Sequence, residues 1–253
     1  GFSSVLLVSS MAASLTADAL SRKVFGMEPI LDFHLETPFP FAHYGFLALF
    51  ALCLGVLGVL FNRVLLGTQD LFSGLRWLSL PFRPVPVFLL AGILGFFVPQ
   101  VLGGGHHLIA SLQATPYTLW VLLLLVSLKF LFTMVSYASA TPGGIFFPLL
   151  TIGALLGAIW GKAFTGILSL DFVVLGMAGY FSAITKAPIT GTLLILEVTG
   201  SFYHLPAIAF SCLLAYVVAD LLGGKPVYDV LLRRLEKKCS RSLDSKSEPE
   251  HTG

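Results

Sequence analysis

Long apolar runs that are repeatedly cut by glycine and proline constrain this chain more than any other feature. Residues 44–66 and 119–135 form two such runs. A helix needs about 20 predominantly apolar residues to cross the hydrocarbon core of a bilayer. The composition agrees: 56% of the residues are hydrophobic and 11% are charged, against about 25% charged in soluble domains. The sequence therefore predicts an all-α, polytopic membrane protein.

The other apolar runs differ in length, and several are too short for a complete crossing. Three reach span length or nearly so, and they cover residues 5–24, 145–163 and 205–222. Three are shorter and end at Pro or Gly, and they cover residues 85–98, 172–184 and 189–198. Broken helices are tolerated at membrane depth only where protein buries them or where they line a cavity. Transporters use them to bring helix ends to an ion site, so the pattern predicts a transport protein.

The charges indicate the topology of the chain. The loop over residues 26–43 contains three acidic residues and no Lys or Arg, whereas the loop near Arg76 and Arg83 is basic. Basic loops favour the cytoplasmic side. The net charge of +2 is too small to indicate a nucleic-acid partner. We expect a multi-pass protein of the cell (inner or plasma) membrane. Residues 1–238 would form its membrane domain, and residues 239–253 a disordered, polar cytoplasmic tail.

The segment Gly144-Ile145-Phe146-Phe147-Pro148 is the first candidate site. It precedes a long apolar run, and its proline suits the first turn of a helix, where an amide has no intrahelical partner. The amides of Ile145 and Phe146 remain able to donate. A helix N-terminus carries about half a positive charge, which attracts an anion at about 4 Å by about 2 kcal/mol at an effective dielectric near 20. This attraction suits a small anion that must also be released.

Charged groups are scarce around this segment. Between residues 84 and 170 only Lys129 and Lys162 are formally charged. Carriers of carboxylates or phosphates more often show an arginine cluster, so a halide such as chloride fits better. Tyr228, just past the last long run, is a second candidate donor, although an interfacial tyrosine is the simpler alternative. The adjacent His106 and His107 are a poor metal pair, and we expect no metal and no cofactor.

Three motifs in order resemble those of the CLC chloride channel and transporter family. Gly144 to Pro148 resembles its GxFxP motif. The stretches 176–179, 186–191 and 196–199 resemble its GMAA…RAPLTG…LEMT stretch, and residues 223–228 resemble its GGKPLY stretch. The resemblance runs from residue 1 to about residue 238, so the chain is identified as a member of this family.

The resemblance implies a CLC fold, in which two inverted halves form one anion pathway in each subunit of a homodimer. This chain resembles one inverted repeat with flanking helices: the last helix of the first half, and the second half with its pathway-lining helix. By carry-over, the amides of Ile145 and Phe146 and the hydroxyl of Tyr228 would coordinate the central chloride. Gly144, Phe147 and Pro148 are the other residues of the GxFxP motif that contains the two amides. Residues 5–20, 189–198 and 205–222 would contribute to the dimer interface.

Some family elements are not in this sequence. The GSGIP segment, the GREGP segment with the gating glutamate, and the glutamate for proton transfer would lie upstream. Glu197 is given no proton role. The resemblance favours voltage-sensitive chloride/proton exchange, and leaves open a passive chloride channel, a fluoride-selective variant or a non-functional fragment. An intramembrane enzyme is disfavoured, because there is no GxSx elbow and Asp18, Asp171 and Asp220 stand isolated.

Overall fold

The computed structural model describes residues 4–26, 31, 33, 38–74, 82–139, 143–165, 170–200 and 202–236. Within these residues all regular structure is helical, which confirms the predicted all-α class. The α-helices are α1 (Ser4–Phe25), α2 (Tyr44–Gly74), α3 (Pro84–Phe97), α4 (His106–Ala114), α5 (Leu119–Ala138), α6 (Phe146–Thr165), α7 (Leu170–Thr185), α8 (Pro188–Thr199) and α9 (Leu205–Leu221), followed by a helix over residues 227–236.

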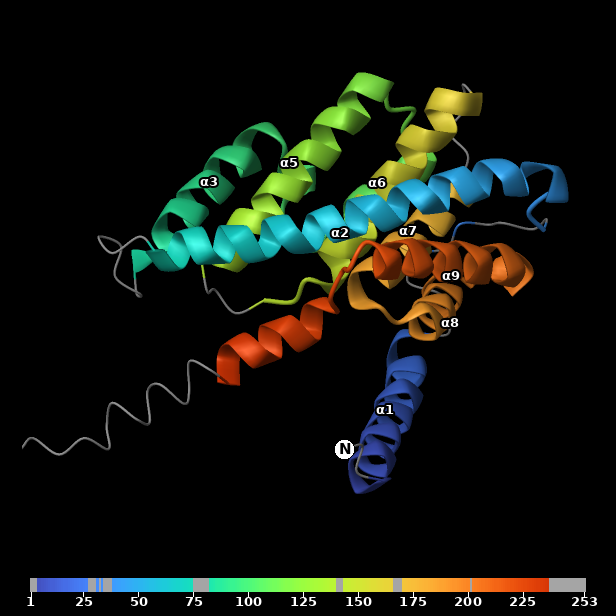
Figure 1. Cartoon of the computed structure of the whole chain (residues 1–253), viewed down its shortest axis with the longest axis horizontal. Coiled ribbons are helices and arrows are strands. Elements are labelled where there is room, and N and C mark those ends of the chain that lie inside the picture. Colours follow the sequence, from blue (N-terminus) through green and yellow to red (C-terminus); the bar gives the residue numbers. More distant parts are fainter. Residues whose placement is uncertain are drawn as a thin grey trace, which may run out of the picture.

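Helix α7 is the centre of the structure. Every residue from Phe172 to Thr185 is buried, because α2, α6, α8 and α9 pack around it (Figure 1). A helix that is apolar on all sides and has only 16 residues is too short to span a bilayer by itself. Burial in the protein therefore explains why this run departs from span length, as the sequence pattern predicted.

Helix α2 is the longest element and crosses the whole face seen in Figure 1. It packs on α7 and α9, and also on α5. Its 31 residues correspond to about 46 Å at 1.5 Å per residue, so it extends beyond a hydrocarbon core of about 30 Å. Part of α2 is therefore expected to lie outside the apolar layer.

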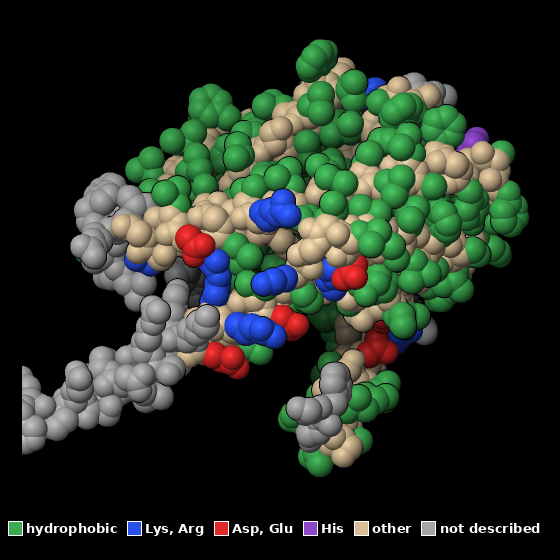
Figure 2. All heavy atoms as spheres, viewed as in Figure 1, with side chains coloured by type: hydrophobic (Ala, Val, Ile, Leu, Met, Phe, Trp, Pro, Cys, Tyr) green, Lys and Arg blue, Asp and Glu red, His purple; other side chains and the backbone are tan. Residues whose placement is uncertain are grey.

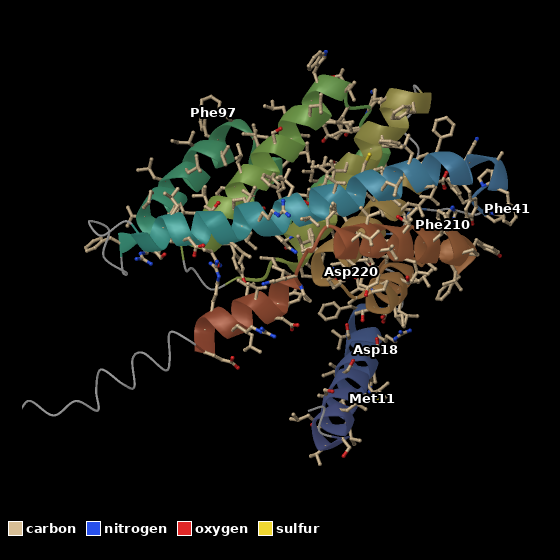
Figure 3. The ribbon with its side chains drawn as sticks, viewed as in Figure 1. Met11, Asp18, Phe41, Phe97, Phe210 and Asp220 are labelled. Atoms are coloured by element: carbon tan, nitrogen blue, oxygen red, sulfur yellow. The ribbon has the colours of Figure 1, made fainter. Side chains whose placement is uncertain are left out.

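Among the residues that the structure describes, five helices are long and apolar enough to cross a membrane: Ser4–Phe25, Phe41–Gly74, Leu119–Ala138, Phe146–Phe164 and Phe202–Leu221. They support a multi-pass membrane protein, and apolar side chains dominate the surface in Figure 2. Helix α1 projects from the other helices and buries none of its residues, so Met11 and Asp18 both lie away from the core (Figure 3).

Glycine and proline break the helices where the sequence predicted. Lys186 ends α7 with a left-handed φ of 60°, and Pro188 begins α8. Gly105, with φ of +96°, precedes α4, a helix of nine residues. A helix over residues 227–236 follows the turn after α9, and the expected tail over residues 239–253 lies outside the described residues.

Helices α6 and α7 approach each other through their backbones. A Cβ on Gly153 would lie 2.6 Å from the carbonyl oxygen of Gly176, and a Cβ on Gly157 would overlap the carbonyl oxygen of Phe172. Small residues permit this approach between membrane helices. The α6–α7 contact is the most extensive between any two described elements.

Gly157→Ala should therefore destabilise the protein by about 1–3 kcal/mol, the usual cost of overpacking. Gly67→Ala in α2 is the matched control, because a Cβ there meets nothing within 4 Å; it should be neutral or stabilise by up to about 1 kcal/mol. Thermal unfolding in detergent, followed by size-exclusion fluorescence, measures both. Equal melting temperatures for the two variants would contradict the close contact.

Candidate anion-binding site

A cavity of about 370 Å³ lies at the start of α6. Helix α3, the loop after it, helix α5 and the segment before α6 each contribute to its wall. The lining residues are Ala91, Leu102, Gly103, Gly104, Phe132, Thr133, Ser136, Tyr137, Gly143, Gly144, Ile145 and Pro148. None of these side chains carries a formal charge, so a bound anion would face backbone dipoles and hydroxyl groups.

Helix α6 directs its N-terminus at this cavity. The amide of Leu149 donates to the carbonyl oxygen of Ile145 at 3.0 Å, which is the first hydrogen bond of the helix. The amides of Ile145, Phe146 and Phe147 precede this bond and have no acceptor within the helix. Together with the helix dipole, such amides form an anion-binding arrangement.

The glycine before α6 leaves room for a ligand. A Cβ on Gly144 would meet nothing within 4 Å, and its φ is not in the left-handed region. Neither backbone strain nor packing therefore requires a glycine at this position. What the glycine provides is open space directly in front of the helix N-terminus.

The loop over residues 102–104, which also lines the cavity, is hydrogen-bonded to α6. Thr151 donates from its hydroxyl to the carbonyl oxygen of Gly104 at 2.9 Å. A Cβ on Gly104 would lie 2.9 Å from the Cβ of Phe147, so the loop and the first turn of α6 are in close contact. This contact fixes the width of the cavity on one side.

Lys129 fastens the same loop from the opposite side. Its side chain is 1% exposed, and its Nζ donates to the carbonyl oxygens of Val101 at 2.9 Å and Gly103 at 2.7 Å. Lys129 is therefore buried in protein and does not face lipid. Because Gly103 lines the cavity, this buried ammonium also adds positive potential beside it.

A polar face of α5 was missed in the sequence analysis. Thr133, Ser136 and Tyr137 line the cavity, and their i, i+3, i+4 spacing places them on one helix face. Lys129 precedes Thr133 by one turn and lies on the same face. The spacing is present in the sequence. The hydropathy of the run predicts a membrane span, however, and does not indicate which of its faces meets a cavity.

The structure divides the predicted motif residues into two groups. Gly144, Ile145 and Pro148 line the cavity. The rings of Phe146 and Phe147 do not: Phe146 packs edge-on against Phe181, with ring centroids 5.7 Å apart, and against Phe147. Only the backbone of these two residues is therefore available to an anion.

Tyr228 is not part of the cavity wall, and it is 47% exposed. Burial raises the pKa of its phenol, and the neighbouring Tyr137, which does line the cavity, raises it further. The phenol therefore keeps its proton at neutral pH and is able to donate a hydrogen bond. The structure thus leaves Tyr228 outside the wall of the cavity, and its role as an anion donor stays a prediction.

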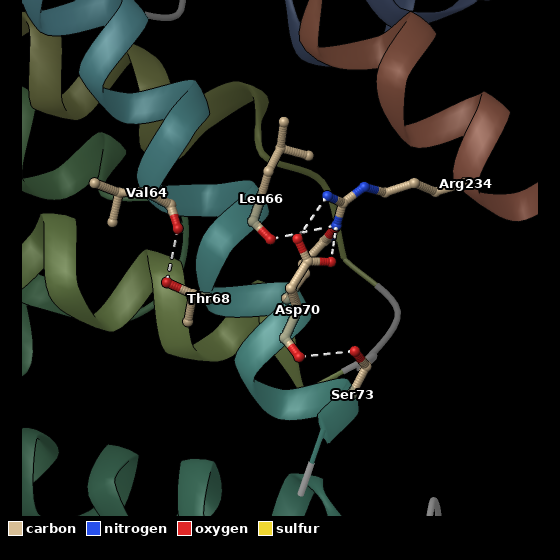
Figure 4. A network of polar contacts seen from close by, with 7 residues as sticks. Val64, Leu66, Thr68, Asp70, Ser73 and Arg234 are labelled. Carbon is tan, nitrogen blue, oxygen red and sulfur yellow. Dashed lines mark hydrogen bonds and ion pairs between the residues drawn. The ribbon is translucent and has the colours of Figure 1, made fainter.

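Arg234 holds the helix that carries Tyr228. Its guanidinium forms a two-pronged ion pair with Asp70, at 2.9 and 3.0 Å. It also donates to the carbonyl oxygen of Leu66 at 3.3 Å and to the side chain of Gln69 at 3.2 Å (Figure 4). Bidentate contacts of this kind restrict geometry as well as adding energy, so the helix over residues 227–236 is fixed to the end of α2.

The cavity carries no formal charge, and broken helices surround it with a helix N-terminus at its wall. This arrangement is typical of polytopic membrane transporters. A sequence model described as "Voltage gated chloride channel" matches residues 1–220. The chain belongs to this family, the CLC family.

Relatives and solved structures agree with this assignment. The chain is 32% identical over 246 residues to the H(+)/Cl(-) exchange transporter ClcA of Vibrio parahaemolyticus, covering 93% of this chain and 52% of that protein. It is 31% identical over 255 residues to the protein of the same name from Citrobacter koseri, covering 94% and 53%. The chain therefore spans about half the length of the curated relatives it matches.

Among solved structures, a slow cyanobacterial Cl-/H+ antiporter superposes with a TM-score of 0.80 at 28% identity, covering 87% of this chain and 53% of that one. A CLC-type fluoride/proton antiporter superposes with a TM-score of 0.71 at 24% identity, covering 86% and 54%. The second likeness concerns the fold alone.

Gly144→Val should lower chloride affinity by about tenfold, or about 1.4 kcal/mol, because its side chain would fill the space in front of α6. Gly67→Val is the control, since it adds the same side chain at an open position away from the cavity. Calorimetric titration of the full-length gene product with chloride measures both. Unchanged affinity in Gly144→Val would mean that the anion lies elsewhere.

Removal of a phenol hydroxyl should weaken chloride binding by about two- to tenfold, the value of one hydrogen bond. We expect this of Tyr228→Phe and Tyr137→Phe, and less than additive losses in the double variant if both hydroxyls serve one anion. Tyr203→Phe, at an exposed position, is the control. Because the pKa of Tyr228 is raised above its ordinary value, the effect should persist unchanged from about pH 6 to pH 9.

Proposed function

We propose that the protein containing this chain exchanges chloride for protons across a cell membrane. The observation that carries the proposal is the N-terminus of α6, which opens onto an uncharged cavity of about 370 Å³. Chloride moves through this cavity, and the protons move in the opposite direction. No residue of this chain is given a proton-carrying role.

The chemistry of the cavity suits a halide. The amides of Ile145 and Phe146 bind the anion, with hydroxyls of α5 and of Tyr228 nearby. Lys129 lies behind the loop, where two carbonyl oxygens accept hydrogen bonds from its ammonium group. Chloride is therefore attracted by partial charges and not held by a full ion pair, so it is bound weakly enough to leave.

The proposed coupling to protons rests on the relatives. The two curated relatives are named H(+)/Cl(-) exchange transporters, and one solved relative is described as a Cl-/H+ antiporter. Transport in these proteins is attributed to chains about twice as long as this one. Exchange is accordingly proposed for the whole protein, and this chain contributes the backbone amides of Ile145 and Phe146 to the anion site.

A homodimer embedded in the cell membrane is part of the same proposal. Several large apolar side chains on α8 and α9 are exposed, among them Ile189, Leu193, Leu213 and Leu221, which are 74%, 60%, 52% and 81% exposed, respectively. They fall on segments that the family resemblance assigns to the interface between subunits. A membrane-embedded partner surface or lipid tails would cover them.

The test is flux through the full-length gene product in liposomes, with a chloride gradient and with chloride and pH recorded together. Uphill proton movement driven by chloride, lost or reduced in Gly144→Val but not in Gly67→Val, is the expected result. Chloride flux without proton movement would make the protein a channel and overturn the exchange. Flux of fluoride without chloride would overturn the proposed substrate.

A further inference from the structure

A second cleft, separate from the anion cavity, lies between α2 and the turn that follows α9. Its volume is about 140 Å³. The lining residues are Val59, Asn62, Arg63, Leu66, Gly223, Gly224, Lys225, Val227 and Val230. It shares no lining residue with the cavity at the start of α6, and neither the transport proposal nor the sequence motifs assign it a ligand.

The turn that forms one wall is rigidly built. Gly223 has a left-handed φ of +68°, and the amide of Gly224 donates to the carbonyl oxygen of Ala219 at 2.9 Å. Asn62 of α2 donates from its Nδ2 to the carbonyl oxygen of Lys225 at 3.0 Å. The cleft is therefore preorganised, because backbone hydrogen bonds and a buried amide fix the turn against α2.

Two cations line the cleft without an anionic partner. Arg63 and Lys225 are exposed, and neither side chain forms an ion pair with any residue that the structure describes. The nearby Lys186, by contrast, is paired with Asp220 at 2.6 Å. Figure 2 shows Lys and Arg side chains beside α2 on this face, with Asp and Glu side chains among them. The uncompensated charge at the cleft is thus positive.

Counting along the helices, we expect the cleft at the level of lipid headgroups. Arg63 follows Tyr44, the first residue of α2, by 19 positions, or about 28 Å along the helix. This is close to the hydrocarbon thickness of about 30 Å. Lys225 follows the end of α9 at Leu221. Both cations therefore mark the point where membrane-crossing helices emerge from the apolar layer.

The side chain of Asn62 indicates a second feature of the ligand, a hydrogen-bond donor. This side chain is 6% exposed, and its Oδ1 has no hydrogen-bond partner among the described residues. A carboxamide oxygen only accepts hydrogen bonds, so its partner must be a donor. A hydroxyl fits better than an ammonium group, because the two neighbouring cations would repel a third positive charge.

We propose that this cleft binds the headgroup of an anionic phospholipid that carries a polyol, such as phosphatidylglycerol. The phosphate lies between Arg63 and Lys225, and a headgroup hydroxyl donates to Asn62. Charge-assisted bonds from guanidinium and ammonium groups to phosphate are among the stronger hydrogen bonds, and basic residues at the membrane surface favour anionic lipids.

The experiment counts lipids bound to the full-length protein by native mass spectrometry, after detergent purification and titration with phosphatidylglycerol or phosphatidylethanolamine. The double variant Arg63→Gln/Lys225→Gln is compared with Lys23→Gln/Arg233→Gln, which removes two exposed positive charges that do not line the cleft. Arg63→Lys/Lys225→Arg restores the charge. All proteins are first checked for equal melting temperature.

We expect at least one phosphatidylglycerol retained by the wild type, the control and the charge-restoring variant. Retention should fall about tenfold in Arg63→Gln/Lys225→Gln, and phosphatidylethanolamine should bind more weakly than phosphatidylglycerol throughout. Equal retention by the Gln variant and its control would overturn the site. Saturation of the site by inorganic phosphate, with no preference for phosphatidylglycerol, would assign the cleft to a soluble anion and overturn the lipid.

Discussion

The backbone contact between α6 and α7 is the interaction on which the rest of the structure depends. Where a side chain at Gly157 would overlap the carbonyl oxygen of Phe172, the two helices can only be held by direct packing of their main chains. Apolar burial cannot drive helix association within lipid, so such contacts supply van der Waals energy in its place. They hold α7 at the centre and fix the direction of α6, and hence where its N-terminus lies.

This dependence explains what the sequence could predict. The breaks in the apolar runs, the buried short helix α7 and the motif at the start of α6 were all predictable, because Gly and Pro act locally and hydropathy needs no partner. The cavity lining was predictable only in part. Gly144, Ile145 and Pro148 line it, but which groups of the motif face the cavity depends on how the rings of Phe146 and Phe147 pack.

The contribution of α5 could not be assigned from the sequence. Lys129 bonds to carbonyl oxygens at Val101 and Gly103, residues that precede it by 28 and 26 positions. A periodic pattern identifies a polar face but does not say what that face meets. Thr133 and Tyr137 therefore became interpretable only after the fold had placed the loop of α3 and the start of α6 against the same face of α5.

Two kinds of force hold the two candidate donors of the anion site. The amides of α6 are positioned by main-chain packing inside the apolar layer, and they respond mainly to changes in volume. Tyr228 is positioned by polar contacts where the helices emerge, namely Asn62 to Lys225 and Arg234 to Asp70. An exposed ion pair contributes at most about 1 kcal/mol, so the position of Tyr228 depends on several weak contacts acting together. The candidate amides and the candidate phenol are therefore positioned by different kinds of contact, main-chain packing for the amides and a set of polar contacts for the phenol.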